Sequence, residues 1–334
     1  MINPLLWDRN IFIFLLSEAI LVATAIIILP ILIKLIIQWD FNSYTQKQYK
    51  LEKNAFLVVT IAIFIFFVKI TLLPYFVFTI DKISSIVPGA MCGAGVISYN
   101  QFGMNLLYLK IFNIFLLTLW IVINRYDLQE GQYRWFKLKS MLFLLITISI
   151  IVEFWLDFSF FNDIDIHTVL NCCSTLYGLL EGMNPLPFGL EKDMLIALFY
   201  ILWLFIISSY LANNKFFHLI GLVLFAIISY YSVLYFFGTY IYEQPNHNCP
   251  FCMFQSDYYY VGYLVWSLLI AGVYIGVSAI FAELFMKRES KNLKKLSTTL
   301  LSLFVIICSL YVIVYVAKNK TLLQEQKQEM VMPM

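Results

Sequence analysis

Charge is what this sequence has least of. Only 13% of its 334 residues are charged, whereas 62% are hydrophobic, and globular domains carry about 25% charged residues. A water-soluble domain needs polar side chains to cover its surface, and a mean hydropathy of +0.83 leaves too few of them. The composition therefore excludes an ordinary soluble enzyme and predicts a protein that resides in a lipid bilayer.

Several functional motifs are missing from the sequence as well. Nucleotide-binding, zincin and nucleophile-elbow patterns do not occur, which argues against an ATP-driven pump and a hydrolase. The first apolar run lacks a basic n-region and a small-residue cleavage site, so we interpret it as a retained span and not as a signal peptide. The bilayer is the expected environment, and no nucleic-acid partner is expected.

Long apolar runs are what the sequence does contain. A bilayer core of about 30 Å needs about 20 apolar residues of helix, because no water is present to satisfy the backbone. Eight runs meet this length, near 11–38, 54–80, 106–124, 141–160, 193–213, 217–242, 259–284 and 298–317. The connections are too short for a separate folded module. We therefore predict an all-α, polytopic membrane helix bundle of about eight transmembrane helices, with 1–334 as a single integral membrane domain.

The distribution of Lys and Arg predicts how the bundle is oriented. Loops after the first, third, fifth and seventh spans hold thirteen of the 22 basic residues, against six on the opposite side. Basic residues favour the cytoplasmic side, so we expect short basic cytoplasmic loops and both termini outside. We expect a bacterial inner membrane, with the remaining loops on the periplasmic or outer side; in a eukaryote these loops would be lumenal.

Five of the six cysteines fall in the three interior outside loops, near 81–105, 161–192 and 243–258. Cysteines that merely filled gaps between helices should favour the spans, and these do the opposite. The outer side is oxidising, so paired thiols there persist as disulfides. Five cysteines cannot all pair within one chain, so at least one must stay free, exchange partners, bind metal or join another protein. The five residues are Cys92, Cys172, Cys173, Cys249 and Cys252.

The strongest single motif is a C-x-x-C pair just before the seventh span. Two intervening residues let both sulfurs face one point, which suits a reversible disulfide or a soft-metal clamp. A helix-start location would lower the pKa of one thiol. The segment Cys249-Pro250-Phe251-Cys252 resembles the redox pair of membrane thiol oxidoreductases of the DsbB and vitamin K epoxide reductase families. The resemblance implies thiol–disulfide chemistry. The next residue is Met253 and not His, which excludes a c-type haem attachment site.

The other outside cysteines offer related chemistry. Cys172 and Cys173 are adjacent, so a disulfide between them would be strained and easily reduced. As thiolates they would bind a soft cation, and the pair is similar to that of mercury-uptake membrane proteins. Cys92 lies in a loop of small residues, where the backbone can approach closely or turn tightly.

Ionisable residues inside spans are costly and invite a functional interpretation. Lys69 lies deep in the second span, where Pro74 is expected to break the helix, and it could pair with Glu18 or Glu153 or offer charge to a quinone oxygen or an anion. Glu153 and Asp157 share one helix face. They could release protons beside a redox thiol or admit a cation; the alternative is a solvated helix end.

The remaining charged, histidine, glycine and aromatic residues of interest each carry an expectation of their own. Lys34 and Glu283 are expected to snorkel at inner helix ends, and His167 and His247 could be general bases, metal ligands or simply solvated. Gly272 begins a GxxxG motif, which we expect to serve helix packing within the chain. Aromatic residues next to the C-x-x-C are compatible with a quinone pocket, namely Phe251, Phe254 and Tyr259.

Three functional hypotheses remain open. The first is a thiol–disulfide oxidoreductase that exchanges electrons with a membrane quinone or an extracytoplasmic thiol protein. Its catalytic cysteines would be Cys249, Cys252, Cys172, Cys173 and Cys92, and its proton or charge relay Glu153, Asp157, Lys69 and His247.

The second hypothesis is a Cu(I)-type metal transporter or binding protein, and the third is a non-catalytic subunit with structural disulfides. Metal binding would use the same five cysteines together with Met253, and the alternating methionines of the tail 330–334 also suit Cu(I).

Overall fold

A computed structural model describes residues 3–40, 45–130, 134–166, 168, 186, 189–245 and 247–323. These residues form helices and connecting segments, with no strand among them, which confirms the predicted all-α class. Eight helices are long and apolar enough to cross a membrane, as the apolar runs predicted. The predictions for Cys172, Cys173, His167 and the tail 330–334 lie outside the described residues.

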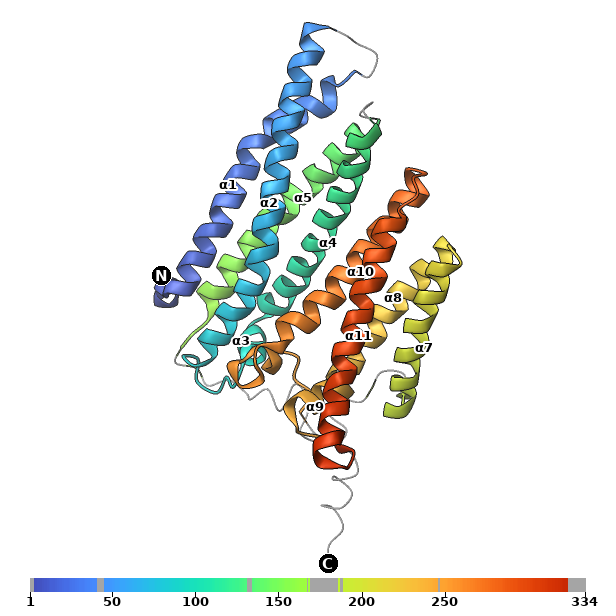
Figure 1. Cartoon of the computed structure of the whole chain (residues 1–334). Coiled ribbons are helices and arrows are strands. Elements are labelled where there is room, and N and C mark those ends of the chain that lie inside the picture. The colour runs from blue at the N-terminus through green and yellow to red at the C-terminus, as the bar shows by residue number, and fades with distance from the viewer. Residues whose placement is uncertain are drawn as a thin grey trace, which may run out of the picture. The chain divides into compact units, whose positions relative to one another are not determined.

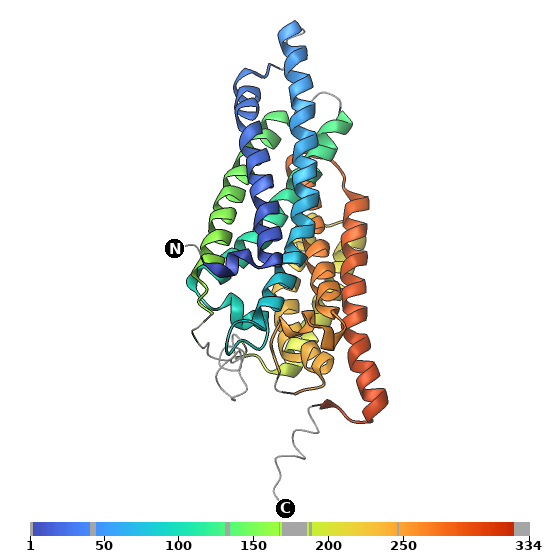
Figure 2. The same ribbon diagram turned by 90° about the vertical axis from the view of Figure 1, so that its left-hand side faces the viewer.

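The chain divides into two compact units. The first unit comprises Met1–Ile80 and Ile97–Thr168. Its helices lie side by side, in blue to green in Figure 1 and from a second side in Figure 2. They are the short η1 (Pro4–Trp7), α1 (Arg9–Gln38), α2 (Gln46–Ser84, whose last turn belongs to the second unit), α4 (Gln101–Glu130) and α5 (Phe136–Asp163).

The second unit comprises Asp81–Val96 and Val169–Met334. The rod α8–η3–α9 runs from Lys215 to Tyr242 and contains one π-helical turn. The elements of this unit are most of α3 (Gly93–Ile97), α7 (Lys192–Leu211), α8 (Lys215–Ser232), η3 (Val233–Phe237), α9 (Gly238–Tyr242), η4 (Cys252–Phe254), η5 (Ser256–Tyr258), α10 (Val261–Phe285) and α11 (Lys291–Asn319).

The GxxxG motif packs α10 inside the second unit, as predicted. A Cβ placed on Gly272 would lie 2.6 Å from Leu301 of α11, and one on Gly276 would lie 2.6 Å from Leu222 of α8. The Ser297 hydroxyl also donates to the Gly272 carbonyl at 2.6 Å. The two glycines therefore let three helices of one chain approach closely.

Helices extend beyond the apolar runs that predicted them. Helix α2 begins at Gln46, α4 ends at Glu130 and α5 begins at Phe136. A helix satisfies its own backbone, so it need not end where the bilayer core ends. The expected break at Pro74 is wrong, because α2 continues through this residue. Lys69 therefore stays in the interior of a continuous helix.

The distribution of side chains is that of a protein in lipid. Phe56 and Leu211 are 74% and 75% exposed, whereas Lys69 and Lys110 are 3% and 4% exposed. In water the apolar side chains would be buried and the lysines solvated. Apolar outer faces around buried charges are expected of a membrane bundle.

Candidate functional site

Three thiols meet in the second unit. The Sγ atoms of Cys92, Cys249 and Cys252 all lie within 4.8 Å of one another, and all three residues are buried. The Cys92 and Cys249 sulfurs are 3.6 Å apart. A disulfide bond is about 2.05 Å long, so these two sulfurs are hydrogen-bonded and not joined in a disulfide. The structure thus adds Cys92 to the C-x-x-C motif.

Two loops hold the thiols together. Cys249 and Cys252 lie in the connection between α9 and α10, and Cys92 directly precedes α3. Gln255, three residues after Cys252, joins the loops, because its side-chain amide donates to the Asp81 carboxylate at 3.1 Å and to the Met91 carbonyl at 3.4 Å. One amide side chain therefore fixes the C-x-x-C loop against the segment that carries Cys92.

A tyrosine hydroxyl closes the C-x-x-C loop itself. Tyr242, the last residue of α9, donates a short hydrogen bond to the Cys249 carbonyl and accepts one from the Met253 N–H at 3.2 Å. Both ends of the motif thus bind one buried hydroxyl. Tyr242 was not among the predicted site residues; the available signal was a tyrosine at the end of a span, where a buried hydroxyl needs partners.

The two thiols of the C-x-x-C motif differ in pKa. Hydrogen bonds from Cys252 and then from Cys92 lower the pKa of Cys249 to about 4, outweighing the opposing effect of burial. The hydrogen bond to Cys249, followed by that to Cys92 and by burial, raises the pKa of Cys252. Cys249 is therefore the more acidic thiol of the pair, and Cys252 is the less acidic one. The expected helix-start effect is a smaller cause: the backbone N–H groups of Phe251 and Cys252, at the start of η4 and not of α10, also lower the pKa of Cys249.

His247 lies close to the motif without reaching the sulfurs through any described bond. Its ring packs edge-on against Tyr242 at 4.4 Å between centroids. Burial lowers the pKa of His247, and its Nε2 atom has no hydrogen-bond partner among the described residues. The residue is therefore a neutral imidazole that fills space beside the loop.

The aromatic residues assigned to a quinone pocket do not all gather. Phe251 is buried and its ring centroid lies 6.2 Å from that of Phe254, which packs on Tyr263 at 4.9 Å. Tyr259 points away, with 90% of its side chain exposed. Met253, the predicted additional metal ligand, is buried and packs against α10: a Cβ placed on Gly262 of α10 would lie 2.6 Å from the Met253 Cγ.

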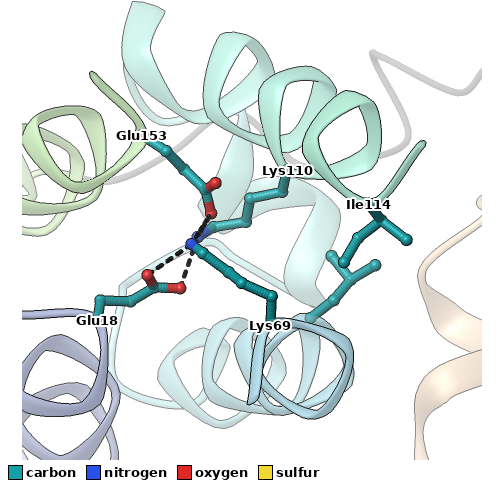
Figure 3. Close-up of a pocket in the computed structure, with 6 residues that line it drawn as sticks. Glu18, Lys69, Lys110, Ile114 and Glu153 are labelled. Atoms are coloured by element: carbon teal, nitrogen blue, oxygen red, sulfur yellow. Dashed lines mark hydrogen bonds and ion pairs between the residues drawn. The ribbon is translucent and has the colours of Figure 1, made fainter. Parts of the chain in front are cut away.

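A second cluster, made of buried charges, lies in the first unit. The Lys69 Nζ is 2.6 Å from Glu18 Oε2 and 2.8 Å from Glu153 Oε1, so both predicted ion pairs are present at once. Figure 3 shows the amine between the two carboxylates. Helices α1, α2 and α5 each supply one of these groups.

Lys110 of α4 completes the cluster. Its Nζ lies 2.8 Å from Glu153 Oε1 and 2.8 Å from Asp157 Oδ2. Glu153 and Asp157 are 2% and 0% exposed, so the alternative of a solvated helix end is wrong. Lys110 lies four residues after the start of the apolar run near 106–124, and no role was predicted for it. Because α4 begins at Gln101, this lysine instead lies more than two turns inside the helix.

Two neutral side chains extend the cluster. The Asn113 side-chain amide donates to Glu153 Oε2 at 2.5 Å, and the Ser149 hydroxyl donates to Asn113 Oδ1 at 2.5 Å. Lys110 and Asn113 are three residues apart and share a face of α4. This spacing of two polar residues in an apolar helix was the signal that could have identified both.

Lys34 and Glu283, both predicted to snorkel at helix ends, differ in their burial. Lys34 is exposed, in agreement with snorkelling. Glu283 is buried, and its carboxylate lies 2.9 Å from the Lys294 amine and accepts from the Ser290 N–H at 2.7 Å. The snorkelling prediction for Glu283 is therefore wrong, because a lysine of the next helix meets it inside the unit.

Comparison with known protein families, curated proteins and solved structures finds no match for this chain. The functional interpretation therefore rests on the geometry of the two clusters.

Proposed function

We propose that this integral membrane protein is a thiol–disulfide redox protein that exchanges electrons between its cysteines and a membrane quinone or an extracytoplasmic thiol protein. The proposal puts the cysteine-bearing loops on the outer side of a bacterial inner membrane, where thiol oxidation is sustained. Cys249 and Cys252 are the exchanging pair, and Cys92 is the third thiol of a relay.

The observation that carries this proposal is the meeting of three sulfurs within 4.8 Å. Two cysteines suffice for a disulfide that only stabilises a fold. A third thiol within reach allows the bond to move from one pair to another, since exchange proceeds by attack of a thiolate on a disulfide sulfur. Cys249 lies 3.6 Å from Cys92 and has the lowered pKa, so we assign it as the sulfur shared by the two pairs.

The proposed reaction has two steps, oxidation of Cys249 and Cys252 by a quinone and then disulfide exchange with Cys92. The Cys249 thiolate and the Cys252 thiol form a disulfide and give up two electrons, which a quinone accepts with the Cys252 proton and one proton from water to become a quinol. The Cys92 thiol then releases its proton to water, and the resulting thiolate attacks the Cys249 sulfur. A Cys92–Cys249 disulfide forms, and Cys252 leaves as a thiolate that takes up a proton.

The test uses the purified full-length chain, reduced and then treated with a soluble quinone analogue, followed by thiol counting and disulfide mapping. We expect one disulfide within the cluster, with formation of one quinol for every two thiols lost. Cys252→Ser should yield a Cys92–Cys249 bond, and Cys92→Ser a Cys249–Cys252 bond. Cys308→Ser is the matched control, because Cys308 is a buried thiol in α11 and not part of the cluster. Unchanged cluster thiols after quinone treatment would refute the proposal.

A second candidate function, binding of a soft metal such as Cu(I), is favoured by the same spacing. Three thiolates around one metal at about 2.3 Å place their sulfurs roughly 4 Å apart, which matches a cluster whose sulfurs lie within 4.8 Å. Sulfur ligands select Cu(I). Copper loading under reducing conditions distinguishes the two functions. One bound copper per chain, lost in Cys92→Ser and retained in Cys308→Ser, supports the metal site, and metal-free protein excludes it.

A further inference from the structure

The buried charge cluster of the first unit does not balance. It contains three carboxylates, Glu18, Glu153 and Asp157, and two amines, Lys69 and Lys110. With every group ionised, the cluster carries one net negative charge. An unpaired charge at this depth is costly, and the usual response is for a group to become neutral. One additional positive charge would remove the cost.

The oxygen atoms show where that charge fits. Glu153 uses both oxygens, since Oε1 accepts from Lys69 and Lys110 and Oε2 accepts from Asn113. Glu18 Oε2 accepts from Lys69, and its Oε1 lies 3.7 Å from the Lys110 amine. The Oδ1 atom of Asp157 differs from these, because it is buried and no donor in the described part of the chain lies within hydrogen-bonding distance.

A metal cation fits this arrangement poorly. Hard cations take six or more oxygen ligands, whereas four of the six carboxylate oxygens already accept hydrogen bonds from lysine or asparagine. Two ammonium groups at the centre would also repel the ion. A proton needs one oxygen, and Asp157 Oδ1 supplies one.

We propose that the cluster is an exchangeable proton-binding site, in which Asp157 takes up one proton and the site alternates between a net charge of zero and minus one. The groups that face it come from every packed helix: Glu18 from α1, Lys69 from α2, Lys110 and Asn113 from α4, and Glu153 from α5. Membrane proteins use ionisable groups at this depth as proton relays. The proposal is independent of the thiol chemistry of the second unit.

A cavity provides space beside the site. It has a volume of about 10 Å³, room for about one water molecule, and is lined by Glu18, Lys69, Leu73, Lys110, Ile114 and Glu153; Figure 3 shows the labelled side chains around it. Water enters a cavity of sufficient size when several polar partners face it. One water molecule in this space would lie beside the two lysines and the carboxylates of Glu18 and Glu153.

Lys110 is held so that it senses the charge of Asp157. Its amine lies 4.8 Å and 4.7 Å from the ring centroids of Phe14 and Phe76, which keep this side of the site apolar. The same amine bonds to Asp157 and to Glu153. Protonation of Asp157 weakens its bond to the Lys110 amine and leaves the bond between Lys110 and Glu153. The proton therefore changes which of the two carboxyl groups binds Lys110 more strongly.

The test is infrared spectroscopy of the full-length protein in lipid near neutral pH, where a protonated carboxyl group has a carbonyl band distinct from that of carboxylate. We expect such a band, and we expect it to shift when H₂O is replaced by D₂O. Asp157→Asn should remove the band, whereas Asp163→Asn, which changes an exposed acid of the same helix, should retain it.

A second variant tests the charge argument without altering Asp157. Glu18→Gln leaves two carboxylates and two amines, so Asp157 has no excess charge to neutralise and the band should disappear. Retention of the band in either Asp157→Asn or Glu18→Gln overturns the proposal. So does a wild-type band that does not shift in D₂O, because the proton would then not exchange.

Discussion

Removal of one hydroxyl should loosen the C-x-x-C loop. Tyr242→Phe keeps the ring, which packs against His247 and Tyr258 at 4.4 Å and 4.7 Å. It deletes the oxygen that donates to the Cys249 carbonyl and accepts from the Met253 N–H. The substitution therefore isolates the contribution of two hydrogen bonds to the geometry of the motif.

The size of the effect follows from those two bonds. A hydrogen bond contributes about 1 kcal/mol net, and a buried group left unsatisfied costs up to about 3 kcal/mol. Two lost bonds should thus reduce the free energy of opening the loop by at least about 2 kcal/mol. Since about 1.4 kcal/mol corresponds to a factor of ten, the open population should rise by about 30-fold.

Hydrogen exchange measures this opening. The informative amides are those of Phe254 and Gln255, which bond to the Phe251 and Cys252 carbonyls at 3.0 Å and keep these partners in the variant. Their exchange should accelerate by about 30-fold in Tyr242→Phe. Tyr259→Phe is the control, because the Tyr259 side chain is 90% exposed. An acceleration below about threefold would refute a bridging role for Tyr242.

Three further predictions concern the two clusters. Gly262→Ala should destabilise the protein by about 1–3 kcal/mol in thermal unfolding, because its Cβ would lie 2.6 Å from Met253 Cγ and 3.0 Å from the Met253 backbone. Lys110→Met should cost about 3–5 kcal/mol in the same assay, since buried carboxylates lose their partner, whereas the exposed Lys34→Met should change stability by less than about 0.5 kcal/mol. Alkylation of Cys249 should keep a constant rate between about pH 5.5 and 8, because its pKa of about 4 leaves it a thiolate throughout; a rate rising about tenfold per pH unit, as for an ordinary thiol, would contradict this.

The sequence was sufficient to predict the helices because the bilayer imposes a simple rule on each of them. A run of about 20 apolar residues can satisfy its backbone in lipid only as a helix. That rule is local, so it predicted eight helices and missed their polar ends, such as the start of α2 at Gln46. The prediction that Pro74 breaks its helix was wrong, because the effect of a proline depends on the surrounding helices and not on the residue alone.

Which ionisable residues meet inside the bundle is not a local property. The ion pair between Lys69 and Glu153 could be predicted from the sequence, because a buried lysine requires a carboxylate and both residues lie well within their spans. Lys110 looked like a residue near a helix end because the apolar run of its helix starts late, at 106, while α4 itself starts at Gln101. Without Lys110, the acids Glu153 and Asp157 had no second amine, and a solvated helix end was a reasonable alternative.

The thiols show the same limit over a longer distance along the chain. The spacing within Cys249–Cys252 predicts that two sulfurs can face one point, because four consecutive residues determine it. Cys92 precedes Cys249 by 157 residues, and its approach depends on Gln255, which bonds to Asp81 and to the Met91 carbonyl. The parity of the five cysteines that are predicted to lie outside requires that at least one of them remain outside any internal pair. Cys92, held at hydrogen-bonding distance from Cys249, fits that requirement, and Gln255→Ala should therefore separate the third thiol from the pair without removing a sulfur. Disulfide mapping after oxidation of the Gln255→Ala, Cys252→Ser protein should then show less of the Cys92–Cys249 bond than Cys252→Ser alone, and an equal yield would mean that Gln255 does not hold the two loops together.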